Sequence, residues 1–113
     1  MYENISVVAT RGRIKATARF AYPLLVCTCS DFFIYASVAD YLHASTVSVT
    51  CRYNEVVSAN EYFNDSVAVG EALAKVLAAA KIKTVTLTGN RTKLKNTEKA
   101  LINAVKSAGV RVV

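Results

Sequence analysis

Tryptophan is absent from the 113-residue sequence, and proline, histidine and methionine occur once each. The single histidine, His43, has no partner at a spacing that would build a Ser-His-Asp or Cys-His arrangement. The four glycines form neither a G-x-G-x-x-G fingerprint nor a P-loop, so a nucleotide cofactor is not expected. The sequence therefore predicts a protein that is not an enzyme and that uses no cofactor.

Long apolar runs are also missing. The two longest stretches without a charged residue, residues 20–30 and 41–51, have eleven residues each. A helix needs about 20 apolar residues to cross a bilayer, so we expect no membrane partner.

The three cysteines, Cys27, Cys29 and Cys51, are few and odd in number. Such a count without a recognisable signal peptide is not typical of a secreted disulfide scaffold. Cys27 and Cys29 would share one face of a strand, either as a redox or metal pair or as two small apolar residues. One C-x-C motif with one histidine does not match a zinc-binding spacing. We therefore expect a structural role for the cysteines and no bound metal.

Basic charge is concentrated towards the two ends of the sequence, which has a net charge of +6. Residues 1–20 carry four cations against one acid, residues 21–74 one against six, and residues 75–113 nine against one. Two basic segments around an acidic middle favour a surface that binds a polyanion. The alternative is an ordinary solvated surface rich in lysine.

Residues 1–19 are predicted to form a basic N-terminal arm, because they contain few large apolar residues and show no clean period. Their composition is weakly similar to that of a targeting segment or of a nucleic-acid-binding arm. The arm supplies four candidate RNA ligands, Arg11, Arg13, Lys15 and Arg19. Residues 20–113 are predicted to form a single domain.

Three consecutive antiparallel strands are expected after Pro23, over residues 24–29, 33–39 and 45–52. A tight hairpin joins the first two. In the third, Val47, Val49 and Cys51 alternate with hydroxyl side chains and with Arg52. This alternation predicts that one face of the sheet is packed and the other is exposed.

The apolar spacing becomes helical after residue 64, with Asn64 or Asp65 as the predicted N-cap. A strand over residues 84–88, a loop and a second helix follow, with Asn96 or Thr97 as the second cap. A last edge strand over residues 110–113 is also considered. The predicted fold class is α/β (α+β), with a mixed sheet in the order β-β-β-α-β-α, in which the fourth strand can run parallel to an earlier one.

The loop before the second helix carries the densest group of polar and basic side chains. It contains Asn90, Arg91, Lys93 and Lys95, and Lys99 follows on the helix. Cations beside the free amides of a helix N-terminus suit phosphate oxygens. These residues, the arm and Arg52 are the predicted RNA-binding set; the alternative is a solvated loop and a polar helix face.

An ordered series of short motifs resembles the ribosomal protein L eighteen family of the large subunit. The segment from Pro23 to Asp40 reads P-L-L-V-C-T-C-S-D-F-F-I-Y-A-S-V-A-D, where the family reads P-R-L-x-V-x-R-S-N-K-x-I-Y-A-Q-x-x-D. Further along, V-G-E-A-L-A, I-K-T-V and K-A-L-I-N-A are similar to the family's V-G-x-x-L-A, G-I-K-x-V and K-A-L-A-D-A. The resemblance covers roughly residues 11–113, and the series as a whole carries it, because no single motif is decisive.

This resemblance implies a structural constituent of the large ribosomal subunit, located in the central protuberance. Its partners would be 5S rRNA or the neighbouring large-subunit rRNA, together with adjacent ribosomal proteins. Cys29 and Phe32 stand where the family has Arg and Lys, and the family's glycine-rich loop is Asn90–Thr97 here. Such departures are typical of a divergent organellar member, so we expect a mitochondrial ribosome, with a plastid as the alternative.

Two other hypotheses remain at this stage. The small-subunit S eleven family has a similar fold, but its glycine-rich basic loop and long basic tail are not found in this sequence. A small thiol-dependent enzyme would depend on Cys27 and Cys29 alone.

Overall fold

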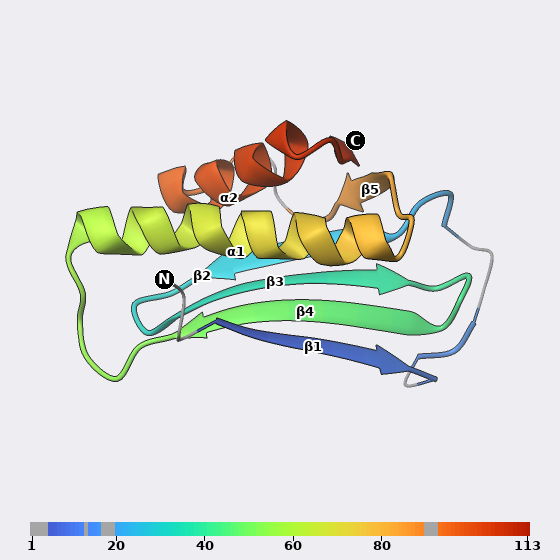
Figure 1. The fold of residues 1–113 in the computed structure, drawn as a ribbon, viewed down its shortest axis with the longest axis horizontal. Helices are drawn as coiled ribbons and strands as arrows, with labels where there is room; N and C mark the ends of the chain where they lie inside the picture. The colour runs from blue at the N-terminus through green and yellow to red at the C-terminus, as the bar shows by residue number, and fades with distance from the viewer. Residues whose placement is uncertain (1–4, 13, 17–19, 90–92) are drawn as a thin grey trace.

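The computed structural model describes residues 5–12, 14–16, 20–89 and 93–113, and it has a mixed α/β fold (Figure 1). The elements follow one another in the order β1 Ile5–Arg11, β2 Leu24–Cys29, β3 Phe33–Asp40, β4 Ser45–Arg52, α1 Ala59–Ala79, β5 Thr84–Leu87, α2 Asn96–Ser107 and β6 Arg111–Val112. The predicted mixed sheet, its three consecutive antiparallel strands and the following α-β-α unit are confirmed. The last edge strand is also present.

The six strands form one sheet in the order β1-β4-β3-β2-β5-β6. Strands β1, β4, β3 and β2 pair antiparallel, whereas β5 runs parallel to β2 and β6 parallel to β5. The register places Ile34, Ala36 and Val38 on the packed face of β3, as the alternation predicted. The helix α1 therefore acts as the connection that carries the chain from the antiparallel half to the parallel half.

Residues 5–11 form the edge strand β1, so the prediction that residues 1–19 lie outside the fold as an arm is wrong for this segment. Every residue of β1 has a partner in β4, from Ile5 opposite Cys51 to Arg11 opposite Ser45. The alternation of apolar and polar residues that marks a strand is not visible in this segment, because the adjacent residues Val7 and Val8 are both apolar and lie on opposite faces. Both remain about half exposed, at 49% and 52%, since neither face of this edge strand is fully covered.

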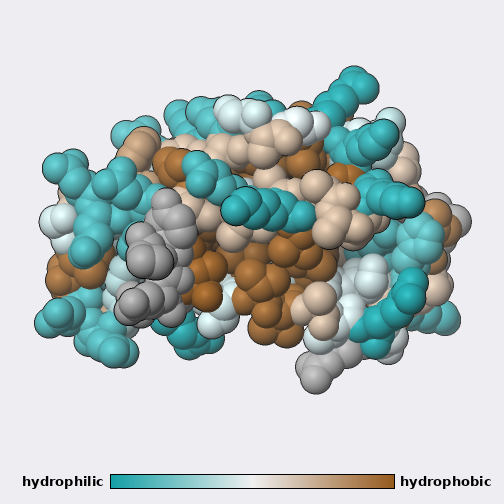
Figure 2. Space-filling model, viewed as in Figure 1, coloured by the Kyte–Doolittle hydropathy of each residue, from teal (hydrophilic) through white to brown (hydrophobic). Residues whose placement is uncertain are grey.

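Both helices lie on the same face of the sheet and pack against each other (Figure 1). The core between helices and sheet contains Leu25, Ile34, Val49, Leu73 and Leu101, all of which are fully buried. α1 packs mainly over β3 and β4. Apolar side chains therefore remain visible beyond the helix, over the strands, in the space-filling view (Figure 2).

The predicted N-caps of both helices are wrong. α1 begins six residues earlier than Asp65, because the Ser58 hydroxyl accepts a hydrogen bond from the Glu61 amide at 3.2 Å. The segment before residue 65 lacks strong apolar spacing, which is why it looked like a loop. α2 has Lys95 as its N-cap, and the Glu98 carboxylate accepts the Lys95 backbone N–H at 2.9 Å. This carboxylate satisfies the backbone N–H of the N-cap residue, which is the role of the third helical residue in a capping box.

The opposite face of the sheet has no helix over it and is rich in hydroxyl groups. Ser37 and Ser48 face each other across β3 and β4, and Thr46 hydrogen-bonds to Thr10 of β1. The predicted half-exposed face of the third strand is thus confirmed. Among the described residues, no helix is both long and apolar enough to cross a membrane.

Gly70 lies at a close contact between α1 and α2. A Cβ atom at this position would come within 2.4 Å of the Leu101 carbonyl oxygen and 2.8 Å of the Ala104 Cβ. The nearest of these atoms belongs to the backbone, so the helices would have to move apart to admit a methyl group. The sequence position is therefore restricted to glycine by packing and not by backbone conformation.

We predict that Gly70→Ala lowers the free energy of unfolding by about 1–3 kcal/mol through overpacking. This loss should appear even though alanine is the better helix former by about 1 kcal/mol. Glu71→Ala, at the exposed neighbouring position, is the control and should stay within about 0.5 kcal/mol of wild type. Denaturant unfolding measures both; a Gly70→Ala midpoint at or above the wild-type value would contradict the close helix contact.

Candidate nucleic-acid interface

The predicted RNA-binding residues are divided between the two ends of the sheet. Arg13, Arg19, Asn90 and Arg91 lie outside the described residues. The other six are all exposed: Arg11, Lys15, Arg52, Lys93, Lys95 and Lys99. Arg11 ends β1 at one end of the sheet, whereas Arg52 ends β4 at the opposite end, where the loop before α2 also lies. The structure therefore does not bring the six described residues of the predicted set together into one surface.

Lys95 forms part of the internal hydrogen bonding of this loop. Its Nζ donates to the Cys29 carbonyl oxygen at 2.8 Å, which ties the start of α2 to the end of β2. One of the three donors of the ammonium group is therefore already used. A structural role for Lys95 thus exists beside the predicted phosphate contact.

The end of the sheet that holds Arg52 and the loop before α2, called here the mixed end, contains charges of both signs. Described acids at this end are Asp31, Glu55, Glu61, Asp65 and Glu98, and described cations are Arg52, Lys93, Lys95 and Lys99. Helix N-termini favour acids in their first turns, and both helices begin here. The described part of the mixed end is therefore close to electrically balanced.

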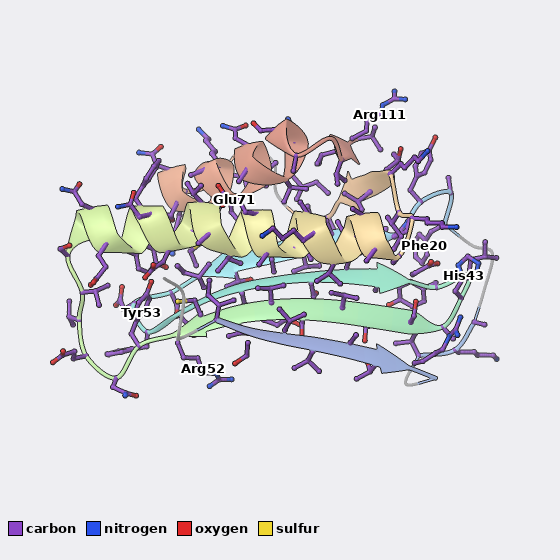
Figure 3. All side chains as sticks on the ribbon, in the orientation of Figure 1. Phe20, His43, Arg52, Tyr53, Glu71 and Arg111 are labelled. Carbon is purple, nitrogen blue, oxygen red and sulfur yellow. The ribbon has the colours of Figure 1, made fainter. Side chains whose placement is uncertain are left out.

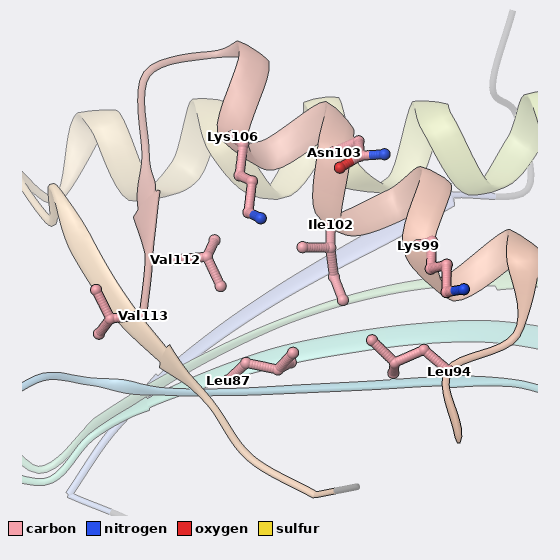
Figure 4. Close-up of a pocket in the computed structure, with 8 residues that line it drawn as sticks. All are labelled: Leu87, Leu94, Lys99, Ile102, Asn103, Lys106, Val112 and Val113. Atoms are coloured by element: carbon pink, nitrogen blue, oxygen red, sulfur yellow. The ribbon is translucent and has the colours of Figure 1, made fainter. Parts of the chain in front are cut away.

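A groove of about 260 Å³ runs between α2 and strands β5 and β6 (Figure 4). Its floor is apolar, with Leu87, Ile102 and Val112 among the lining residues, and Lys99 and Lys106 extend along its rim. Lys99, which was predicted as a phosphate ligand, therefore lines an apolar groove and also lies near the loop before α2.

The other end of the sheet, called here the basic end, collects cations that the sequence prediction did not group together. It holds Arg11, Lys81, Lys83, Lys106 and Arg111, all exposed. Arg111 lies beside Lys83 because β6 pairs with β5. The backbone N–H of Arg111 donates to the backbone carbonyl oxygen of Lys83 at 2.8 Å. Both helices end here, and helix C-termini favour positive charge. Asp40 is the only acid among the described residues of this end.

An aromatic cavity of about 330 Å³ opens within the basic end. It is lined by Phe20, Tyr22, Tyr41 and His43 from the segments that flank β2 and β3, and by Lys81 and Lys83 from the turn before β5. The rings of Phe20 and Tyr41 lie 5.2 Å apart at 51°. Phe20, His43 and Arg111 lie at the opposite end of the molecule from Arg52 and Tyr53 (Figure 3).

The Asp40 carboxylate is held at the edge of this cavity by His43. The His43 ring Nδ1 lies 2.7 Å from Asp40 Oδ2, and the His43 backbone N–H donates to Oδ1 at 3.3 Å. The His43 side chain is 60% exposed, whereas that of Asp40 is 14% exposed. The single acid of the basic end is thus already paired within the protein.

Sequence reasoning missed the basic end because its residues are far apart along the chain. Lys81 and Lys83 were not among the predicted RNA-binding residues, and Lys81 adopts the left-handed conformation just after α1, with φ of 60°. The useful signal was the last edge strand considered over residues 110–113, since the pairing of β6 with β5 places Arg111 beside Lys83. The proximity of Phe20 to Tyr41 had no sequence signal.

The cysteines lie in and beside the hydrophobic core. Cys27 and Cys29 share the packed face of β2, as predicted, and Cys29 and Cys51 are buried. Burial raises the pKa of the Cys27 thiol to about 12, and it also raises the pKa of Cys29 and of Cys51. Among the described residues, no three His, Cys, Asp or Glu side chains gather as a metal site would require. The thiols are therefore held in the protonated, weakly nucleophilic form.

No protein-family model matches the chain, and no curated protein matches it either.

We predict that the folded protein loses stability as the pH rises above about 9. A thiol whose pKa is 9.0 when unfolded and about 12 when folded stabilises the fold below pH 9, and this contribution disappears between pH 9 and 12. The raised pKa values of Tyr53 and Tyr62 act in the same direction. Denaturant midpoints at pH 8 and pH 10 measure the loss.

Iodoacetamide labelling at pH 8 gives an independent check of the same pKa shift. Three pKa units between the two states make the Cys27 thiolate on the order of 1,000-fold rarer in the folded chain. The chain unfolded in urea is the control. A folded-state labelling rate equal to that in urea would show that the thiols are accessible and ionisable.

Proposed function

We propose that this protein is a structural constituent of the large ribosomal subunit that binds ribosomal RNA, and that it is related to the L eighteen family. The observation that carries the RNA-binding part is the basic end, with five exposed cations and one acid that is already paired with His43. The family to which the resemblance points has a mixed sheet with helices, and this chain has the same kind of fold.

The basic end has the chemistry that phosphate recognition requires. Its cations come from β1, from the turn after α1, from the last turn of α2 and from β6. Side chains from separate elements of a rigid scaffold can contact several phosphates at once, and they fix orientation without reading sequence. The mixed end supports RNA binding less strongly, because its described acids would repel a nearby phosphate backbone.

The resemblance supports a place in the central protuberance, next to 5S rRNA or to the large-subunit rRNA near it. Cys29 is buried and Phe32 is 55% exposed at positions where the family has basic residues. This exchange of charge for apolar surface supports a divergent organellar ribosome, mitochondrial in the first instance and plastid in the second. It also supports contacts with neighbouring ribosomal proteins at the mixed end.

The alternatives have less support. A thiol-dependent enzyme needs a readily ionised cysteine, and burial has raised the pKa of all three thiols. No described feature favours a small-subunit protein of the S eleven type over the large-subunit assignment.

We predict that a tagged form of the protein sediments with large ribosomal subunits in a sucrose gradient and dissociates from them at high salt. Dissociation by salt is expected because phosphate contacts release counterions when they form. The protein should be followed together with one marker of each subunit. Sedimentation with the small subunit would favour the S eleven alternative, and retention at the top of the gradient would refute a ribosomal role.

We further predict that Lys81→Gln, Lys83→Gln and Arg111→Gln together flatten the salt dependence of RNA binding by about two to three units of slope. The reason is that each cation that neutralises a phosphate contributes about one unit. Folding should change little, since exposed charges contribute little to stability.

The matched control carries the same loss of charge elsewhere, at Lys75, Lys93 and Lys99, each replaced by Gln. It should retain most of the wild-type slope. Equal flattening in the two variants would mean that binding follows net charge alone and that the basic end is not the RNA-binding surface.

A further inference from the structure

We infer that the aromatic cavity of the basic end binds one unpaired nucleotide of the RNA, with its base stacked on the aromatic side chains and its phosphate at Lys81 and Lys83. This inference depends on the proposed function, because it concerns how the same surface recognises RNA. It goes further by assigning a binding site with a defined chemical class of ligand.

The size of the cavity suits one base and its sugar. Its volume of about 330 Å³ lies at the small end of the range of roughly 300–1,000 Å³ for ligand pockets. A double helix cannot enter a space of this size, whereas a nucleotide turned out of a loop or bulge can. Single-stranded loops and bulges are also where proteins most often recognise RNA.

The aromatic lining provides surfaces for stacking. Tyr22 is 43% exposed and Phe20 is 38% exposed, although both rings line the cavity. Large aromatic side chains at the surface of a basic cleft stack on bases without strong sequence preference. The tilted pair of Phe20 and Tyr41 forms one part of the lining, so its rings are already positioned before a ligand arrives.

Lys81 and Lys83 supply the phosphate-binding part of the site. They are two residues apart, both are exposed, and both line the cavity that also holds the aromatic rings. The two lysines therefore border the same cavity as the stacking surface, which is the combination that the phosphate and the base of a nucleotide require.

Asp40 argues against a simple anion site. Its carboxylate lines the same cavity and would repel a free phosphate or sulfate ion that occupied the centre. A nucleotide avoids this conflict, because its neutral base can lie near the carboxylate while its phosphate stays at the lysines. Each Asp40 oxygen also keeps acceptor capacity beyond its contact with His43, and an exocyclic amino group of a base can donate to it.

The test uses the full chain and two RNA hairpins that differ only by one bulged 2-aminopurine nucleotide. Binding is measured by anisotropy of an end label, and stacking is measured by the 2-aminopurine fluorescence. We expect the wild type to bind the bulged hairpin about ten-fold more tightly than the fully paired one, with quenching of the 2-aminopurine.

Tyr22→Ala should abolish the preference for the bulge and the quenching, while the affinity for the paired hairpin remains within about two-fold. Tyr22→Phe should restore both, because it keeps the ring. Phe32→Ala removes an aromatic ring of similar exposure at the mixed end, and as the control it should leave both readouts unchanged. The thermal midpoint of each variant verifies that it is folded.

The possible failures are distinguishable. Equal affinity for the two hairpins without quenching would overturn the nucleotide site and leave the proposed RNA-binding function standing. Quenching that survives Tyr22→Ala but not Phe32→Ala would also overturn it, by moving the stacking surface to the mixed end. Absence of binding to either hairpin would refute both the nucleotide site and RNA binding by the isolated chain.

Discussion

The contact between α1 and α2 at Gly70 is the constraint on which the arrangement of the whole molecule depends. Because no side chain separates the helices there, they can pack closely side by side on one face of the sheet. Both helices start at the mixed end and finish at the basic end. Their placement leaves the hydroxyl-rich face of the sheet open and brings two helix C-termini to the same end of the molecule.

The parallel direction of the two helices also explains why the charges separate. Glu61 and Glu98 lie in the first turns of α1 and α2, and Lys106 lies in the last turn of α2. Each charge complements the helix dipole at its position, which stabilises the helices modestly. The same distribution places acids at the mixed end and leaves the basic end positively charged, as the proposed RNA-binding surface requires. Helix stability and RNA binding therefore favour the same arrangement of charges.

The sequence was informative wherever local periodicity decided the outcome. Alternation located β2, β3 and β4, and the helical spacing from Val69 to Leu77 located the packed face of α1. It failed for β1, where both faces are partly exposed and neighbouring valines conceal the period. It also failed at the start of α1, since the Ser58 cap precedes a polar first turn, and the contact of Tyr62 with Tyr53 depends on the tertiary fold.

The candidate site was harder to predict than the fold because its members are joined only by tertiary pairing. Lys83 and Arg111 become neighbours because β5 pairs with β6. Phe20 precedes β2 and Tyr41 follows β3, and their rings come together at the open end of this hairpin. The loop before α2 was conspicuous in the sequence because its cations lie at every second position of one short segment. The structure adds that Lys95 is also hydrogen-bonded to the end of β2 and that its backbone N–H donates to the Glu98 carboxylate.

The parallel pairing of β5 with β2 determines when the domain can be completed as the chain emerges during synthesis. Strands β1 to β4 are available for pairing once residue 52 has appeared, and each contacts a neighbour within this segment. Leu25, Ile34 and Val49 nevertheless have no helix to cover them until α1 has been synthesised. The outer edge of β2 stays unpaired until β5, about sixty residues further along the chain, has also been synthesised. Contacts over such sequence separations form slowly. A partly formed sheet with an exposed apolar face therefore exists before the domain is complete. It stays accessible to other nascent chains until α2 and β6 have been synthesised.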